Sequence, residues 1–168
     1  MIHVCSLAKL HETVEATGAR HIITLVGRET LLTRPNNVDA ANHLFLSIND
    51  IVSEVEGMVT PGEAHMRDLL DFVRAWPRTA PLVIHCYAGV SRSTAAAYVT
   101  LCALLPHRDE FELAVRLRSA SPTATPNAKI VSLGDAALNR NGRMIRAISA
   151  IGRGRDCMAG EPFQLVLD

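Results

Sequence analysis

Residues 82–94 read Leu-Val-Ile-His-Cys-Tyr-Ala-Gly-Val-Ser-Arg-Ser-Thr, and this stretch decides the fold class. The run at residues 81–85 has the length and the hydrophobicity of a strand buried in the middle of a parallel sheet. Residues 93–105, rich in Ala and Leu, then predict a helix that ends before Pro106. A strand that leads through a short turn into a helix is typical of α/β folds, whose ligands bind beyond the carboxyl ends of the strands.

The first half of the chain alternates strands with helices. Three further apolar or β-branched runs predict strands, at residues 2–5, 21–26 and 43–48. A helix that Ser6 caps and Gly18 ends is expected between the first two of these strands. The pattern predicts an α/β fold with a central, largely parallel sheet of four to five strands flanked by helices.

The second half of the chain is mainly helical. Residues 60–63, Thr-Pro-Gly-Glu, predict a helix start, with threonine as the N-cap, proline as the first helical residue and glutamate completing a capping box. Another helix should begin at Asp109, and one or two should lie within residues 126–152. Residues 153–168 resemble a tail that folds back onto a single domain spanning residues 1–168.

The composition is that of a globular protein without net charge. Of the 168 residues, 48% are hydrophobic and 20% are charged, and 17 basic residues balance 17 acidic ones. This balance disfavours a broad surface for nucleic acid or for an anionic membrane, so we expect neither as a partner. The N-terminus lacks a signal-peptide pattern and no apolar stretch approaches about 18 residues, which predicts a cytoplasmic protein.

The cysteines show no metal-binding pattern. They are widely spaced, at Cys5, Cys86, Cys102 and Cys157. We therefore expect no bound metal, and free thiols are normal in a reduced compartment. Cys5 or Cys102 could protect Cys86 from over-oxidation as a resolving thiol, although buried structural thiols are the more common case.

The turn between Cys86 and Arg92 has the composition of an anion-binding loop. Gly89 allows a positive φ and a close approach of the backbone to a ligand. Successive N–H groups can point inward, and the start of the following helix adds partial positive charge. Arg92 offers two donors to the oxygens of a phosphate-sized dianion, and the same field favours the nucleophilic thiolate of Cys86. The residues expected to line the anion are Tyr87, Ala88, Gly89, Val90, Ser91 and Arg92.

Residues 85–93, His-Cys-Tyr-Ala-Gly-Val-Ser-Arg-Ser, resemble the H-C-x5-R-[ST] signature of the protein tyrosine phosphatases. The sequence of these residues is most similar to the small dual-specificity branch and to compact bacterial tyrosine-phosphatase-like proteins. The resemblance implies that Cys86 attacks phosphorus to form a cysteinyl-phosphate while Arg92 and the loop amides hold the equatorial oxygens. It also implies that Ser93 donates a hydrogen bond to the thiolate, or only caps the helix, and that His85 supports the loop. No cofactor is implied.

The resemblance further implies a carboxylic acid that protonates the leaving oxygen, on a loop about thirty residues before the cysteine. Asp50 lies 36 residues before Cys86, just after an expected strand, and matches this pattern. Asp39 is the main alternative, and Glu54 and Glu56 are two others.

Two other segments of the chain resemble parts of the family. Pro126 and Asn127 are similar to the start of a later helix, so Asn127 would either brace the phosphate loop or only begin that helix. The loop at residues 50–60 contains Gly57 and is long enough to move as a lid. It lacks the tryptophan-proline-aspartate motif of the tyrosine-specific enzymes, so a large closing motion is not indicated.

The resulting hypothesis is a cysteine-dependent phosphomonoester hydrolase, acting on phosphotyrosine or with dual specificity on proteins, or on a small phosphomonoester. Phosphate, sulfate or vanadate should bind the loop. The alternatives are a non-catalytic phosphate-binding module and a rhodanese- or arsenate-reductase-like cysteine enzyme; Ser93 and Asp50 favour phosphate chemistry. No lysine occurs at residues 87–91. Because phosphoinositide phosphatases of the superfamily that the chain resembles tend to carry basic residues there, the resemblance implies phosphoproteins rather than inositol lipids.

Overall fold

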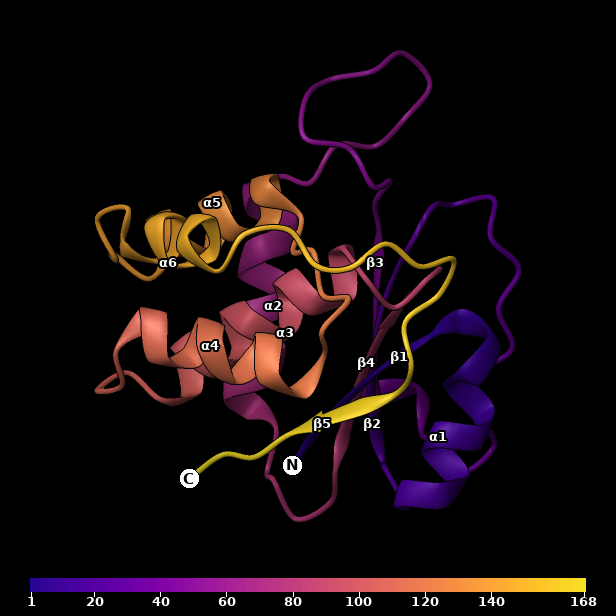
Figure 1. Cartoon of the computed structure of the whole chain (residues 1–168). Coiled ribbons are helices and arrows are strands. Elements are labelled where there is room, and N and C mark those ends of the chain that lie inside the picture. Colours follow the sequence, from indigo (N-terminus) through magenta and orange to yellow (C-terminus); the bar gives the residue numbers. More distant parts are fainter.

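A five-stranded sheet forms the centre of the molecule (Figure 1). In the computed structural model, which describes residues 1–168, the strand order is β3-β2-β4-β1-β5. The strands are β1 (Ile2–Ser6), β2 (His21–Val26), β3 (His43–Ser47), β4 (Leu82–Cys86) and β5 (Phe163–Leu165). The first four run parallel, and β5 joins the β1 edge in the antiparallel direction. The prediction of a largely parallel α/β sheet of four to five strands is confirmed.

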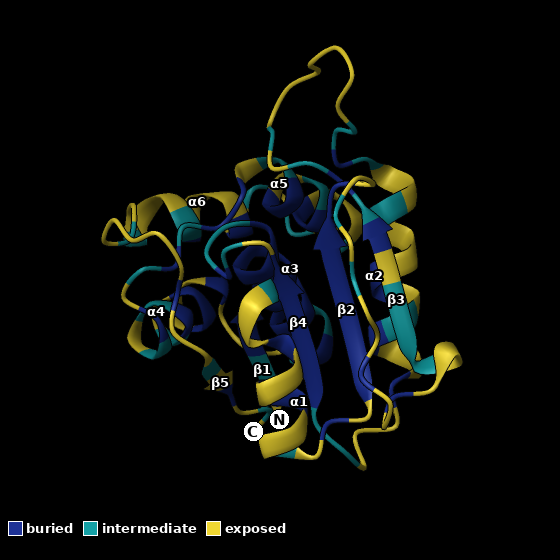
Figure 2. Cartoon of the chain, turned by 90° about the vertical axis from the view of Figure 1, so that its right-hand side faces the viewer, coloured by how far each residue is buried: buried dark blue, intermediate teal, exposed yellow.

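Strand β4 lies in the middle of the sheet, between β2 and β1. All of its residues are buried, as Figure 2 shows for β4 and β2 together. Cys86 pairs with Ser6 of β1 and with Leu25 of β2, so three parallel strands end side by side at the position of the cysteine. The sheet therefore places the turn after β4 where α/β proteins bind ligands.

The helices cover the two faces of the sheet unequally (Figure 1). They are α1 (Leu10–Thr17), α2 (Glu63–Ala75), α3 (Arg92–Leu104), α4 (Glu110–Ala120), α5 (Ala128–Ala137) and α6 (Arg143–Ile151), with short 3₁₀ turns at Leu7–Lys9 and Ala40–Asn42. Helix α1 packs on one face over a small core of 7 buried residues, whereas the other helices enclose a core of 31. None of the helices combines the length and the apolar character needed to cross a bilayer.

Two predicted caps are wrong. Ser6 makes no side-chain cap, because the 3₁₀ turn comes first and the α-helix begins only at Leu10. Helix α2 begins at Glu63 rather than at Pro61, with Gly62 as its N-cap. The Gly62 N–H donates to Nδ1 of His65 at 3.1 Å, so this histidine takes the capping role predicted for the glutamate.

Other predicted helix signals agree with the structure. The Asp109 carboxylate accepts hydrogen bonds from the N–H groups of Phe111 and Glu112, at 2.9 and 3.0 Å, and α4 follows it. Residues 126–152 form two helices, α5 and α6. The tail folds back and forms β5 against β1.

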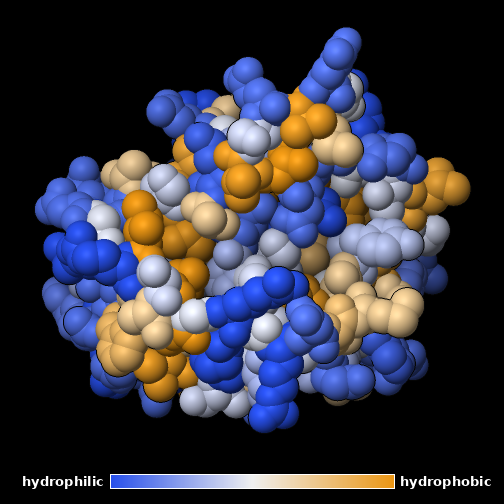
Figure 3. Space-filling view, turned by 45° about the horizontal axis from the view of Figure 1, so that its top comes forward, coloured by the Kyte–Doolittle hydropathy of each residue, from blue (hydrophilic) through white to orange (hydrophobic).

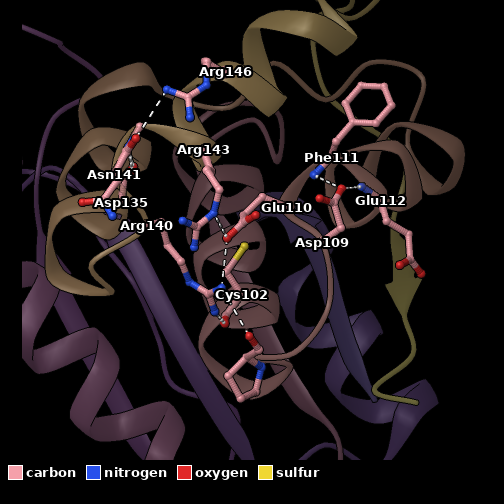
Figure 4. A network of polar contacts seen from close by, with 12 residues as sticks. Cys102, Asp109, Glu110, Phe111, Glu112, Asp135, Arg140, Asn141, Arg143 and Arg146 are labelled. Atoms are coloured by element: carbon pink, nitrogen blue, oxygen red, sulfur yellow. Dashed lines mark hydrogen bonds and ion pairs between the residues drawn. The ribbon is translucent and has the colours of Figure 1, made fainter.

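A buried carboxylate, Glu110, ties α4 to α6 and to the end of α3 (Figure 4). Its Oε1 accepts from Nη1 of Arg140 at 2.9 Å and from Nε of Arg143 at 3.0 Å. Arg140 also donates to the carbonyl of Cys102, and Tyr98 Oη donates to the carbonyl of Glu110. Burial acts to raise the pKa of Glu110, but the hydrogen bonds and the two guanidinium groups outweigh it and lower the pKa. Glu110 thus remains ionised inside the helical layer.

Replacing Glu110 by alanine should therefore lower the free energy of unfolding by about 3 kcal/mol, because the substitution leaves Arg140 buried without its partner. Urea denaturation measures this loss. The matched control is Glu112, which lies two residues later on the same helix and is half exposed in its pair with Arg108. Glu112→Ala should cost under about 0.5 kcal/mol. Equal losses in the two variants would contradict the role given to the buried carboxylate.

Candidate active site

The cysteine loop, residues 86–92, joins the end of β4 to the start of α3. Its carbonyl groups are bound from outside by segments distant in sequence. The pairs are Tyr87 O with Leu7 N (3.1 Å), Ala88 O with Gly160 N (2.9 Å) and Val90 O with Thr125 N (2.9 Å). Because the two ends of a peptide unit point in opposite directions, these bonds turn the N–H groups of residues 88, 89 and 91 to the inner side of the loop. The Gly89 N–H does point inward, since it donates to Sγ of Cys86 at 3.3 Å. Such a row of N–H groups is a site for an anion.

Gly89 gives the loop its sharp turn. Its φ is +73°, and a Cβ at this position would lie 2.7 Å from the backbone nitrogen of Ser6 and 2.8 Å from the carbonyl carbon of Cys5. A side chain would thus be strained by the conformation and would also collide with the end of β1. The loop therefore packs directly against the backbone of the neighbouring strand.

Cys86 lies at the bottom of the loop, 2% exposed. Its Sγ is 3.1 Å from Oγ of Ser93, which is fully buried. Helix α3 begins at Arg92 with Ser91 as the N-cap residue, so the alternative that Ser93 caps this helix is wrong. The hydroxyl of Ser93 instead faces the thiol, where it can donate a hydrogen bond to a thiolate.

Arg92 is anchored on one side only. Its Nη1 donates to the carbonyl of Ile48 at 2.8 Å, just beyond the end of β3. Its Nε is buried and has no hydrogen-bond partner in the protein. The side chain is 8% exposed, so the guanidinium is held rigidly while keeping donors for a ligand in the loop.

Asp50 lies directly beside the cysteine loop. Its Oδ1 accepts hydrogen bonds from Oγ of Ser91 at 2.7 Å and from Nδ2 of Asn127 at 2.8 Å. The loop that carries it is closed at its neck, where Asn49 and Val59 exchange two hydrogen bonds of 2.8 Å. Asp50 is thus already fixed at the site, and no closure of residues 51–58 is required to bring it there.

The structure assigns Asn127 a place beside Asp50. Its Oδ1 caps α5 by accepting from the N–H groups of Lys129 and Ile130, while its amide nitrogen donates to Asp50. It contacts the cysteine loop only through its backbone N–H, 3.3 Å from the carbonyl of Ser91. Asn127 both begins the helix and holds the carboxylate.

The other acidic candidates lie away from Cys86. Asp39 is the N-cap residue of the 3₁₀ turn before β3, at the opposite end of that strand from Asp50. Glu54 and Glu56 are exposed on the loop between Asn49 and Val59. Of the four predicted alternatives, only Asp50 contacts a residue of the cysteine loop.

His85 lies behind the site rather than in it. It is fully buried, and its Nε2 is 2.7 Å from Oγ1 of Thr24 on β2. Burial lowers the pKa of His85 to about 4, so the ring is neutral at pH 7. It supports the strand that carries the cysteine and does not reach the pocket.

A pocket of about 570 Å³ opens over the cysteine loop. It is lined by Leu7, Gly27, Glu29, Thr30, Leu31, Asn49, Asp50, Tyr87 and Arg92. Residues 27–31 form a wall that could not be expected from the sequence, because the segment carries no motif. Exposed hydrophobic residues, Val52, Val55 and Met58, lie on the neighbouring loop, and Figure 3 shows hydrophobic patches among hydrophilic surface at this end of the molecule. No three His, Cys, Asp or Glu side chains are grouped to hold a metal ion.

Solved structures share this architecture at low sequence identity. The chain matches DUSP15 with a TM-score of 0.62 and 14% identity, over 89% of this chain and 90% of the other. It matches human DUSP28 with a TM-score of 0.59 and 21% identity (83% and 92% covered), and PTPMT1 with 0.61 and 16% (90% and 96%). The chain has the fold of the protein tyrosine phosphatase superfamily. No protein-family model and no curated protein matches the sequence.

Two other cysteines, Cys5 and Cys102, are buried in this fold, and neither is bonded to Cys86. Cys5 pairs with His85 in the sheet, so its side chain lies on the opposite face from that of Cys86. Cys102 lies in the last turn of α3. Burial raises the pKa of Cys5 to about 11 and that of Cys102 to about 12, and all four cysteines are free. Both thiols are therefore buried and protonated at neutral pH.

Gly89→Ala should lower the free energy of unfolding by more than about 2 kcal/mol, since the new methyl group meets the backbone of β1 in addition to the strained φ. Gly57 is a matched control: its φ is +78°, but nothing lies within 4 Å of a Cβ built there. Gly57→Ala should cost only about 1 kcal/mol. Urea denaturation of both variants separates the collision from the strain, and equal losses would show that the contact with β1 is unimportant.

Proposed function

We propose that the protein is a cysteine-dependent phosphomonoester hydrolase of the tyrosine-phosphatase type, acting on phosphorylated proteins with tyrosine or dual specificity. The observation that carries this proposal is the convergence of four side chains at one end of the sheet. Cys86, Ser93, Arg92 and Asp50 all lie in or directly beside a loop whose N–H groups point inward. The shared fold supports the same assignment.

In the first step, the loop N–H groups and Arg92 would bind the phosphoryl oxygens of the substrate. The Cys86 thiolate attacks phosphorus, so that an S–P bond forms as the P–O bond to the leaving group breaks. Protonated Asp50 gives its proton to the leaving oxygen. Both hydrogen bonds that hold Asp50 go to Oδ1, which leaves Oδ2 to carry the proton.

In the second step, a water molecule attacks the phosphorus of the cysteinyl-phosphate and passes a proton to Asp50. The S–P bond breaks, inorganic phosphate leaves, and the electron pair returns to Cys86 as a thiolate. The Ser93 hydroxyl, 3.1 Å from the sulfur, stabilises this thiolate by a hydrogen bond. The acid of the first step is thereby restored.

The charges of the pocket bear on the substrate. Arg92 is the only cation among its lining residues, whereas Glu29 and Asp50 supply two carboxylates. A second phosphate group on the substrate would meet no further cation and would face Glu29. This favours a single phosphate on a neutral or basic carrier, such as a phosphopeptide. A structure of PTPMT1 in complex with PI(5)P shares the fold, so a lipid headgroup is the alternative to test.

Hydrolysis of p-nitrophenyl phosphate without added metal tests the chemistry. Activity should be inhibited by vanadate and lost in Cys86→Ser and Arg92→Lys. Asp50→Asn should lower kcat about 10²-fold or more, because the leaving group loses its acid. Asp39→Asn, at the far end of β3, is the control and should leave kcat unchanged.

Three results would overturn the proposal. Activity that survives Cys86→Ser excludes a cysteinyl intermediate. Phosphopeptide binding without turnover by the wild-type chain indicates a binding module. Formation of thiocyanate from thiosulfate and cyanide indicates a sulfur transferase.

Substitutions at Glu29 test the substrate class. Glu29→Lys should raise kcat/KM for a soluble inositol bisphosphate about tenfold while lowering it for a phosphotyrosine peptide with basic flanking residues, because the charge facing the carrier is reversed. Glu15→Lys, on the exposed face of α1, is the control for net charge. If wild type already prefers the inositol compound, or if both variants act alike, the phosphopeptide assignment is wrong.

A further inference from the structure

Three side chains from three adjacent strands form a hydrogen-bonded row behind the cysteine. Thr24 of β2 lies between His85 of β4 and His43 at the start of β3. Oγ1 of Thr24 is 2.7 Å from Nε2 of His85 and 2.8 Å from Nε2 of His43. Thr24 and His85 are fully buried, whereas His43 is half-buried. The row therefore runs from the residue next to the nucleophile toward the edge of the sheet.

The outer end of the row is open to solvent. A surface pocket of about 660 Å³ is lined by His43, Phe45, Arg34, Thr30, Thr33 and Leu32. Burial lowers the pKa of His43, and Arg34 lowers it further. The groups that face His43 are the Arg34 guanidinium from the preceding loop, His85 through Thr24, and the Phe45 ring packed edge-on at 6.4 Å. No carboxylate is among these groups, so nothing offsets the lowered pKa and His43 carries its charge only at acidic pH. Because the surface pocket reaches His43, the ring can exchange protons with solvent.

Proton counting links the two rings. A threonine hydroxyl has one proton to donate and two lone pairs to accept with, and Thr24 has no third partner. It therefore donates to one histidine and accepts an N–H from the other. When His43 is protonated both of its ring nitrogens carry hydrogen, so Thr24 must accept from His43 and donate to His85. The single proton of neutral His85 then lies on Nδ1, the side of the ring away from Thr24.

The change of tautomer at His85 alters the electrostatic environment of the adjacent Cys86. Nδ1 of His85 is buried and has no hydrogen-bond partner, and the backbone of Cys86 acts to raise the pKa of this histidine against the larger effect of burial. An N–H at Nδ1 thus turns the positive end of a dipole toward Cys86, whereas an N–H at Nε2 turns it toward Thr24. The first arrangement favours the thiolate.

We propose that His43 and Thr24 are positioning residues for Cys86, and that the protonation state of His43 selects the tautomer of His85 through the Thr24 hydroxyl. The proposal rests on the proposed function for its biological meaning, since the thiolate is the nucleophile of that reaction. As a consequence, a larger fraction of Cys86 remains a thiolate when the pH falls through the range in which His43 becomes protonated.

The rate of alkylation of Cys86 by iodoacetate, followed by peptide mass spectrometry between about pH 5 and pH 9, measures the thiolate without requiring turnover. A Cys157→Ser background removes the exposed thiol. Thr24→Val should lower the rate near pH 6 by about threefold, the order expected for one hydrogen bond, and Thr24→Ser should restore it. His107→Gln, an exposed histidine outside the row, is the control and should match wild type.

Long-range ¹⁵N NMR of the histidine rings gives the direct readout. In wild type, the Nδ1–H form should become the sole tautomer of His85 as His43 becomes protonated, and this change should be absent in His43→Gln. Unchanged alkylation profiles in folded Thr24→Val and His43→Gln, or a His85 tautomer independent of His43, would overturn the proposal. If Thr24→Val does not fold, the half-buried His43→Gln decides. A wild-type chain that shows the tautomer change but hydrolyses no phosphomonoester would refute the proposed function and leave the coupling intact.

Discussion

The hydrogen bonds that hold the carbonyl groups of the cysteine loop from outside are the constraint on which the site depends. A loop of this length could satisfy its own polar groups by folding inward, and its N–H groups would then be occupied. Instead, Leu7, Thr125 and Gly160 take the carbonyls, and each of these residues comes from a different part of the chain. The N–H groups of residues 88, 89 and 91 face the inner side of the loop because three separate segments have converged around it. The anion site is thus a product of the whole tertiary structure.

The same convergence brings Asp50 beside the loop of Cys86 although 36 residues separate them in the sequence. Parallel pairing of β2 with both β3 and β4 brings the ends of these strands to one edge. Arg92 then reaches across to Ile48, and Asp50 follows two residues later. Asn127 completes the arrangement by using one end of its amide to begin a helix and the other to hold the carboxylate. Asp50, the proposed general acid, is therefore positioned by the same contacts that build the core.

The sequence was sufficient for the parts of the site that are local. A buried strand, a glycine turn and a helix start lie within residues 82–94, so their chemistry and their order could be predicted together. Asp50 could be selected because it follows an expected strand at about the distance before the cysteine that the family resemblance implies for the acid. The start of α2 was predicted two residues early, because His65 offers a capping acceptor that competes with the glutamate of the motif.

Contacts between distant residues could not be predicted in this way. Glu29 lies in a segment without periodicity, and only the folded chain shows that it lines the pocket. Thr24 and His85 are neighbours through strand pairing, and Gly160 reaches Ala88 from the tail. No pattern within the sequence marks such pairs, because each depends on the register of the sheet or on the path of a loop.

The closed neck between Asn49 and Val59 has a consequence for how this fold can diversify. The two hydrogen bonds there separate the residues that fix Asp50 from the residues 51–58 that extend beyond them. The length and composition of that outer segment can therefore change without displacing Asp50. Segments exchanged at this point would alter the surface beside the pocket while Asp50 keeps its place beside the cysteine loop.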